Sequence, residues 1–239
     1  VRLDAAKGAK LDVWVASRDE LQAKQYLLAC KRWARVLNLA AEDLGEQVID
    51  SQKDLSAFVL RFSSGLCIYT LSSNPDAIAG KSGHIVLDEF ALHKDQRTLY
   101  AVAKPAIQWG GTLSVISTHR GTGSIFNGII RDIKERSNPM GWSLHRVTVH
   151  DAVDQGLVER INQVTGQAET RDQWLSRQRA ECIDEDQWQQ EYCCTPADDN
   201  AAFLPWEMII ACEGTDTLKS LDYLRSTDIP LYLGMVVAG

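Results

Sequence analysis

The chain has 239 residues, of which 45% are hydrophobic, and a formal net charge of −7 with a pI near 5.3. This length and hydrophobic content suit one large domain, or one domain and part of another. The acidic balance argues against a basic protein that coats nucleic acid, although a local basic patch could still contact DNA.

No apolar run approaches the roughly eighteen residues that a membrane-spanning helix needs, and the N-terminus has no signal-peptide pattern. We therefore expect a soluble, cytoplasmic protein with no membrane partner. The six cysteines form no C-x-x-C pair, and none lies at zinc-finger spacing from histidines. We expect reduced thiols.

The first elements form a strand-helix unit. Residues 11–16 are mainly apolar and predict a strand. From residue 19 to about residue 41, apolar side chains recur near helical spacing, with Ser17 or Asp19 as the N-cap.

A predicted β-hairpin and a long loop follow. The apolar runs at 57–62 and 66–71 are separated by a short polar turn. In the loop at 72–83, Gly80-Lys81-Ser82 matches the end of a phosphate-binding P-loop, but Pro75 occupies the position of its first glycine. A true P-loop also begins a helix, whereas a strand is predicted here, so we interpret the match as accidental.

The stretch His84-Ile85-Val86-Leu87-Asp88-Glu89-Phe90 is the centre of the prediction. Its three apolar residues predict a strand buried on both faces of a parallel sheet. The carboxyl end of such a strand reaches the crevice where ligands bind in open α/β sheets. Asp88, in the position of a Walker B aspartate, would hold the water shell of a Mg²⁺ on the β- and γ-phosphates, while Glu89 would deprotonate the attacking water. Alternatively, both acids lie in the first turn of the next helix and stabilise its dipole.

A second strand is predicted to end in polar residues at the same edge. A helix is expected at 99–107, broken near Pro105, and residues 112–117 predict the next buried strand. In a parallel sheet its end lies beside the acid pair, where a hydroxyl or imidazole could sense the γ-phosphate. The candidates are Ser117, Thr118, His119 and Arg120. Alternatively, this segment is an ordinary loop before a helix capped by Ser124.

The remaining elements are predicted from shorter patterns. Residues 142–149 predict a strand, and His145 and His150 are interpreted as ordinary polar residues because no matched third metal ligand accompanies them. Helices are expected at about 170–194, anchored by aromatic residues. Short helices should follow, and 229–237 is strongly β-like.

Several segments, taken in order, carry a resemblance to a known family that covers nearly the whole chain. They are residues 13–17, 74–80, 86–91, 116–121, 190–194, 203–205 and 232–234. Together they resemble the large terminase subunit of tailed bacteriophages, most closely its Mu-like branch.

This resemblance implies a P-loop NTPase-like α/β domain of three layers with a mainly parallel sheet. It implies an ATPase that pumps double-stranded DNA into a procapsid, joined to an RNase H-like nuclease. ATP and Mg²⁺ would be its cofactors, and its partners would be DNA, the portal protein, the small terminase subunit and further copies in a ring. By resemblance Asp88 is the Walker B aspartate, Glu89 is the catalytic glutamate, and Ser117-Thr118-His119, followed by Arg120, is the coupling segment.

The resemblance also predicts what this chain lacks. The Walker A strand, its loop and its arginine would lie upstream of Val1, so residues 1–195 would be a partial ATPase domain that we expect to be inactive alone. Residues 196–228 would form a linker or helical subdomain, and 229–239 the first strand of the truncated nuclease. By resemblance, Val236 occupies the position at which the family carries a metal-binding aspartate, and a valine side chain cannot ligate Mg²⁺. Either the parent protein has lost nuclease activity, or the residue was altered to silence it, or the alignment of this strand is off by a residue or two. The alternatives are a helicase-like motor and a non-enzymatic assembly module.

Overall fold

The computed structural model describes residues 11–50, 55–72 and 74–197. Most of the predicted linker at 196–228, the whole predicted nuclease strand at 229–239 and Val236 lie outside the described residues.

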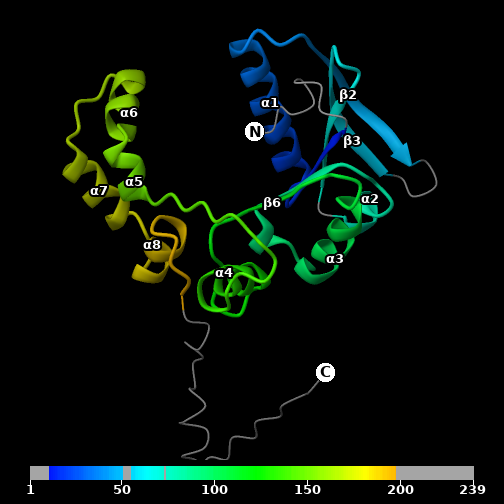
Figure 1. Cartoon of the computed structure of the whole chain (residues 1–239). Helices are drawn as coiled ribbons and strands as arrows, with labels where there is room; N and C mark the ends of the chain where they lie inside the picture. Colours follow the sequence, from blue (N-terminus) through cyan, green and yellow to red (C-terminus); the bar gives the residue numbers. More distant parts are fainter. Residues whose placement is uncertain (1–10, 51–54, 73, 198–239) are drawn as a thin grey trace, which may run out of the picture. The chain divides into compact units, whose positions relative to one another are not determined.

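A mainly parallel sheet forms the centre of the fold (Figure 1). The order of its six strands is β2-β3-β4-β1-β5-β6. β1 runs parallel to both of its neighbours, β4 and β5, and β6 runs parallel to β5, whereas β2 and β3 form the antiparallel side. The strands are β1 Val13–Ala16, β2 Ala41–Asp50, β3 Leu55–Phe62, β4 Cys67–Leu71, β5 His84–Asp88 and β6 Leu113–Ile116. The predicted α/β fold with a mainly parallel sheet is confirmed.

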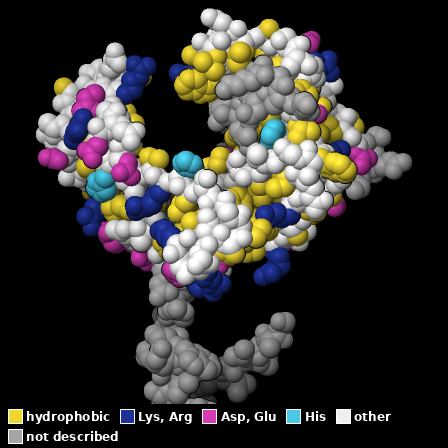
Figure 2. Space-filling model, viewed as in Figure 1, with side chains coloured by type: hydrophobic (Ala, Val, Ile, Leu, Met, Phe, Trp, Pro, Cys, Tyr) yellow, Lys and Arg dark blue, Asp and Glu magenta, His cyan; other side chains and the backbone are white. Residues whose placement is uncertain are grey.

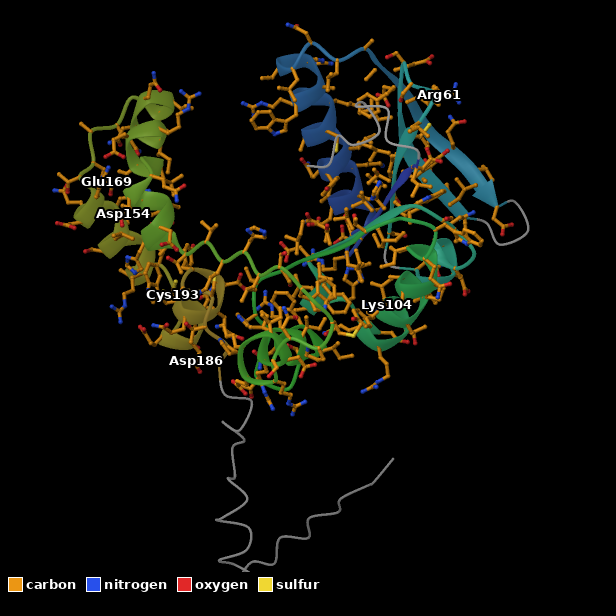
Figure 3. All side chains as sticks on the ribbon, viewed as in Figure 1. Arg61, Lys104, Asp154, Glu169, Asp186 and Cys193 are labelled. Atoms are coloured by element: carbon orange, nitrogen blue, oxygen red, sulfur yellow. The ribbon has the colours of Figure 1, made fainter. Side chains whose placement is uncertain are left out.

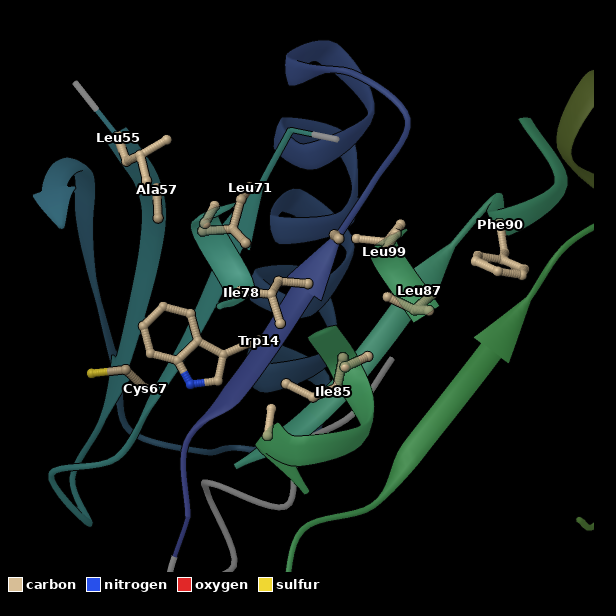
Figure 4. Packing of buried hydrophobic residues seen from close by; sticks show 14 of the residues in the cluster. Trp14, Leu55, Ala57, Cys67, Leu71, Ile78, Ile85, Leu87, Phe90 and Leu99 are labelled. Atoms are coloured by element: carbon tan, nitrogen blue, oxygen red, sulfur yellow. The ribbon is translucent and has the colours of Figure 1, made fainter. Parts of the chain in front are cut away.

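The two central strands, β1 and β5, are apolar because helices cover both of their faces. Val86 packs in a cluster with Leu27 of α1, Glu20–Val36. Ile85 and Leu87 point to the opposite face, where they pack in a cluster with residues of α2, Pro75–Ile78, and α3, Gln96–Ala106 (Figure 4). Side chains that alternate along a strand thus fill two cores, and the predicted three layers are confirmed.

Local signals set the helix boundaries. Asp19 caps α1, because its carboxylate accepts a hydrogen bond from the backbone N–H of Gln22 at 2.9 Å. α3 is not broken at Pro105, which lies near its end. α4, Ile125–Glu135, begins at its N-cap Ser124, as predicted.

Four further helices follow, and they share a small core. They are α5 Val149–Asp154, α6 Leu157–Thr165, α7 Arg171–Ala180 and α8 Glu185–Glu191. Trp174 and Trp188 are buried in this core, and Tyr192 packs against it. These are the aromatic anchors expected from the sequence.

Two further helix or strand predictions were wrong, and a third strand was predicted correctly but is less buried than expected. Residues 142–148 form no strand, and Val149 begins α5, because Thr148 and Asp151 form a capping box that starts a helix there. α1 ends at Val36, residues 37–40 form a short connection, and β2 begins at Ala41, where the predicted helix was to end. β6 is less buried than expected, since Ile116 is 48% exposed.

In the part of the chain that the structure describes, no helix combines the length and apolar character needed to cross a membrane. The cysteines of that part are free thiols: Cys30, Cys67, Cys182, Cys193 and Cys194. Burial raises the pKa of Cys30 to about 12.

Candidate active site

Asp88 lies at the carboxyl end of β5, beside the end of the neighbouring strand β1. There the hydroxyl of the fully buried Ser17 donates a hydrogen bond to Asp88 Oδ2 at 3.3 Å. Burial raises the pKa of Asp88, and the Ser17 hydrogen bond opposes that shift. Asp88 is therefore a partly desolvated carboxylate whose orientation is restrained from the next strand.

Glu89 turns the chain sharply away from the sheet. Its backbone is left-handed, with φ 52° and ψ 44°, and its side chain caps no helix. Only a single 3-10 turn, Phe90–Leu92, follows it, and α3 begins later with Asp95 as its own N-cap. The alternative in which the acid pair begins a helix is therefore wrong, and with it the main support for a non-enzymatic module.

The charges around Glu89 act in opposite directions. Burial is the largest influence and raises the pKa of Glu89, and the carboxylates of Asp88 and Glu191 raise it further. Arg120 and Arg18 oppose these effects. A carboxylate with a raised pKa accepts a proton more readily near neutral pH, which is the property a general base needs.

His93 fixes the segment that follows the acid pair. It is buried, and its Nε2 lies 2.9 Å from the backbone carbonyl oxygen of Asp88, so Nε2 must carry the proton and donate it. Burial lowers the pKa of His93, which favours this neutral form. Fully buried Phe90 also anchors the turn.

The polar end of β6 lies beside the acid pair, as predicted. Ile116 pairs with Asp88 in the parallel register, and the hydroxyl of Ser117 accepts a hydrogen bond from the backbone N–H of Ala91 at 3.0 Å. The loop after β6 is thus attached to the turn that displays Glu89.

The rest of the predicted coupling segment has mixed surroundings. Thr118 is half-buried, and Arg120 is exposed and forms an ion pair with Glu191 at 2.7 Å. His119 is only 5% exposed, and its Nδ1 has no hydrogen-bond partner among the residues that the structure describes. Burial, followed by Lys134 and Arg146, lowers the pKa of His119, so the ring is neutral near pH 7.

Ser124 also caps α4, through a hydrogen bond from the backbone N–H of Asn127 at 3.2 Å. The segment after β6 is therefore a strand-to-helix loop, and this geometry is compatible with a sensing role as well.

The sequence analysis missed Ser17, Arg18 and His93 as candidate site residues. Ser17 and Arg18 follow β1, so the rule that the carboxyl ends of parallel strands meet at one edge could have identified them. His93 carries no such signal, because only the turn after Glu89 brings its ring back to Asp88.

The residues present fit a magnesium ion that arrives with a nucleotide. Among the described residues, no group of three or more His, Cys, Asp or Glu side chains could hold a metal. Mg²⁺ usually keeps several waters and binds through one or two carboxylates plus substrate phosphates, and Asp88 is a carboxylate of the type that such a site uses.

Two other features do not contribute to this site. Gly80-Lys81-Ser82 is followed by β5 and not by a helix, which agrees with the interpretation of an accidental match. Hydrophobic side chains gather over α1 (Figure 2), where Leu28, Trp33 and Val36 help to line a hollow of about 540 Å³. That hollow has no acidic residue in its lining.

Comparison of the sequence with a family model and with individual proteins gives results that agree with each other. The model of the family "Terminase large subunit, T4likevirus-type, N-terminal" matches residues 13–209. The Mu-like prophage FluMu protein gp28 of Haemophilus influenzae is 34% identical over 214 residues, which cover 87% of this chain and 42% of that protein. The probable terminase large subunit gp28 of Escherichia phage Mu is 33% identical over 213 residues, which cover 86% of this chain and 38% of that protein.

Solved structures show a weaker likeness. The large terminase of a thermophilic bacteriophage in complex with ADP has a TM-score of 0.43 and 19% identity, over 64% of this chain and 36% of that one. The large terminase ATPase domain of Thermus phage P74-26 has a TM-score of 0.40 and 16% identity, over 78% of this chain and 77% of that one. TM-scores this low support no conclusion about the function of this chain.

The chain spans about two fifths of the length of the two sequence relatives. The family model, however, covers most of the chain, and both relatives exceed 30% identity over more than four fifths of it. The chain therefore belongs to the terminase large subunit family.

Proposed function

We propose that this chain is part of the ATPase motor that packages double-stranded phage DNA into procapsids, and that residues 1–195 belong to its ATPase domain. One observation carries the proposal: two adjacent carboxylates stand at the carboxyl end of central strand β5, where Asp88 is restrained by Ser17 and Glu89 is displayed by a left-handed backbone. Neither acid caps an α-helix, so neither is explained by local structure.

The two acids would have different roles. Asp88, held by the Ser17 hydroxyl, would orient the water shell of a Mg²⁺ bound to the β- and γ-phosphates of ATP. Bound Mg²⁺ would neutralise charge on the phosphates. Glu89, whose pKa is raised, would take the proton from the attacking water.

The segment after β6 would report loss of the γ-phosphate. Ser117 is attached to the turn after Glu89, so a shift of that turn would reach Thr118 and His119 directly. Arg120 would contribute positive charge near Glu89, since it lowers the pKa of that acid.

The phosphate-binding loop would come from another part of the longer protein. Two features support this: the G-K-S segment is followed by a strand, and β6 is the edge strand of the described sheet. The backbone at that edge is where one more strand would pair. We further propose that the motor works as a homo-oligomeric ring with DNA, the portal protein and the small terminase subunit as partners. The nuclease remains a prediction from sequence.

The test uses the full-length protein and measures ATP hydrolysis and nucleotide binding. Glu89→Gln retains size and hydrogen bonding but removes the base, so turnover should fall by about 10²- to 10⁴-fold while ATP still binds. Asp88→Asn should instead weaken Mg²⁺-dependent nucleotide binding. Glu42→Gln, an exposed change on β2, is the matched control. Wild-type turnover in Glu89→Gln would eliminate the proposed base.

A further inference from the structure

The loop formed by residues 117–121, here called the coupling loop, is held at both ends by other parts of the chain. At its start, the Ser117 hydroxyl accepts a hydrogen bond of 3.0 Å from the backbone N–H of Ala91, beside the acid pair. At its end, the backbone N–H of Gly121 donates to Gln190 Oε1 at 2.7 Å. Gln190 lies 69 residues away in sequence, on α8.

A second contact to α8 involves charge. Arg120 forms an ion pair with Glu191 at 2.7 Å, and the Glu191 side chain is only 27% exposed. Gln190 and Glu191 are consecutive residues, so one turn of α8 binds both the backbone and the side chain of the coupling loop. Two neighbouring contacts restrain a loop more than either would alone, because the second bond forms on an already ordered segment.

α8 is itself well fixed by the helices around it. Trp188 is 4% exposed, and its ring stacks on Tyr192 at a centroid distance of 4.9 Å. The backbone carbonyl oxygen of Tyr192 accepts a hydrogen bond of 2.8 Å from the backbone N–H of Val149. Figure 3 labels Asp186 near the start of α8 and Cys193 just after its end. The coupling loop is therefore held against a packed element and not against a mobile side chain.

The ion pair with Glu191 determines where the Arg120 guanidinium lies at the end of the coupling loop. Without Glu191, the exposed Arg120 side chain would be free to turn toward solvent.

We propose that Gln190 and Glu191 are positioning residues for ATP hydrolysis: Gln190 holds the backbone of the coupling loop at Gly121, and Glu191 holds the Arg120 side chain at the same end of that loop. The proposal rests on the proposed function, because it assigns a role around the same acid pair. Neither residue touches the acid pair directly in any hydrogen bond or ion pair of the described structure. Each would act through the coupling loop.

The first experiment is independent of activity. In the full-length protein, hydrogen exchange is measured for peptides that cover residues 117–121. Gln190→Ala removes the acceptor of the Gly121 amide, so exchange there should accelerate about tenfold. Gln189→Ala is the matched control, because its side chain binds Glu185 and not the loop. Unchanged exchange in Gln190→Ala would overturn the loop-holding role.

The second experiment measures ATP hydrolysis by the full-length protein. Glu191→Gln should lower kcat by about tenfold and leave KM for ATP within about twofold, because orientation is lost while binding contacts remain. Its melting temperature should match that of Glu185→Gln, another change on α8, which breaks an ion pair with Arg179 of α7. If Glu191→Gln fails to fold, Glu191→Asp provides the comparison.

A double-mutant cycle tests whether Glu191 acts through Arg120. In an Arg120→Ala background, Glu191→Gln should have no further effect on kcat, whereas additive losses would refute the assignment. A kcat within about twofold of wild type in the single Glu191→Gln variant would also refute it. A wild-type protein without ATPase activity would refute the proposed function and with it the assigned roles in hydrolysis, while the exchange experiment would still decide whether Gln190 holds the loop.

Discussion

Replacing Glu89 by glycine is expected to stabilise the protein while it removes the proposed catalytic base. Glu89 has φ 52° and ψ 44°, a left-handed conformation that costs a residue with a side chain roughly 1–2 kcal/mol. Glycine adopts it without strain, but a glycine makes the unfolded chain more flexible at a cost of roughly 0.5–1 kcal/mol. The Glu89 side chain caps no helix, so no stabilising cap is lost. With the middle of each range, the net gain should be about 0.75 kcal/mol.

Thermal unfolding of the full chain measures this gain, with Glu89→Gln as the reference variant. Both changes remove the carboxylate and its repulsion from Asp88, so that repulsion does not enter their difference. Glu89→Gly should melt about 1–4 °C above Glu89→Gln. Asn38→Gly is a second control: Asn38 has φ 53°, but asparagine tolerates this conformation, so a smaller rise is expected. If Glu89→Gly melts at or below Glu89→Gln, the backbone at this position is not strained.

Two further predictions concern buried polar groups. Ser17→Ala removes the hydroxyl that binds Asp88 and should lower the free energy of unfolding by about 1 kcal/mol in urea denaturation, with weaker Mg²⁺-dependent nucleotide binding in the full-length protein; unchanged values in both measurements would contradict the restraint on Asp88. The second concerns His119, whose pKa is lowered from 6.5 in the fold, so the unfolded chain binds a proton that the folded chain does not, and stability should fall as pH drops below 6.5 toward the lowered pKa. His119→Gln should reduce the slope of melting temperature against pH in that window, and equal slopes in both proteins would count against a neutral buried imidazole.

Local chemistry in the sequence determined the central strands and the first helix. Ile85, Val86 and Leu87 could be recognised as a strand buried on both faces of the sheet. Side chains of an uninterrupted apolar run point alternately to both faces, so both faces must be covered. Asp19 could be recognised as a cap because its side chain bonds the next turn of the same helix. The position of the acid pair at the carboxyl end of β5 followed from the same run.

Strands that depend on distant partners were less predictable. Residues 142–148 contain the apolar residues Trp142, Leu144 and Val147, but no described strand pairs with them, and Leu144 and Val147 stay exposed. β2 was missed for the opposite reason: its side chains are mostly polar and exposed, and pairing with β3 makes it a strand. Strand preference reflects neighbours more than intrinsic conformation.

The tertiary structure alone decided how the candidate site is held together. Adjacency of the acid pair and Ser117 was predictable, because the ends of parallel strands meet at one edge. The hydrogen bond from Ser17 to Asp88 spans 71 residues, and the bond from Gly121 to Gln190 spans 69. The left-handed backbone at Glu89 is likewise imposed by its surroundings, since glutamate has no preference for it. Sequence patterns record what each element needs for its own burial, whereas these contacts exist only because packing brings separate elements to the same edge of the sheet.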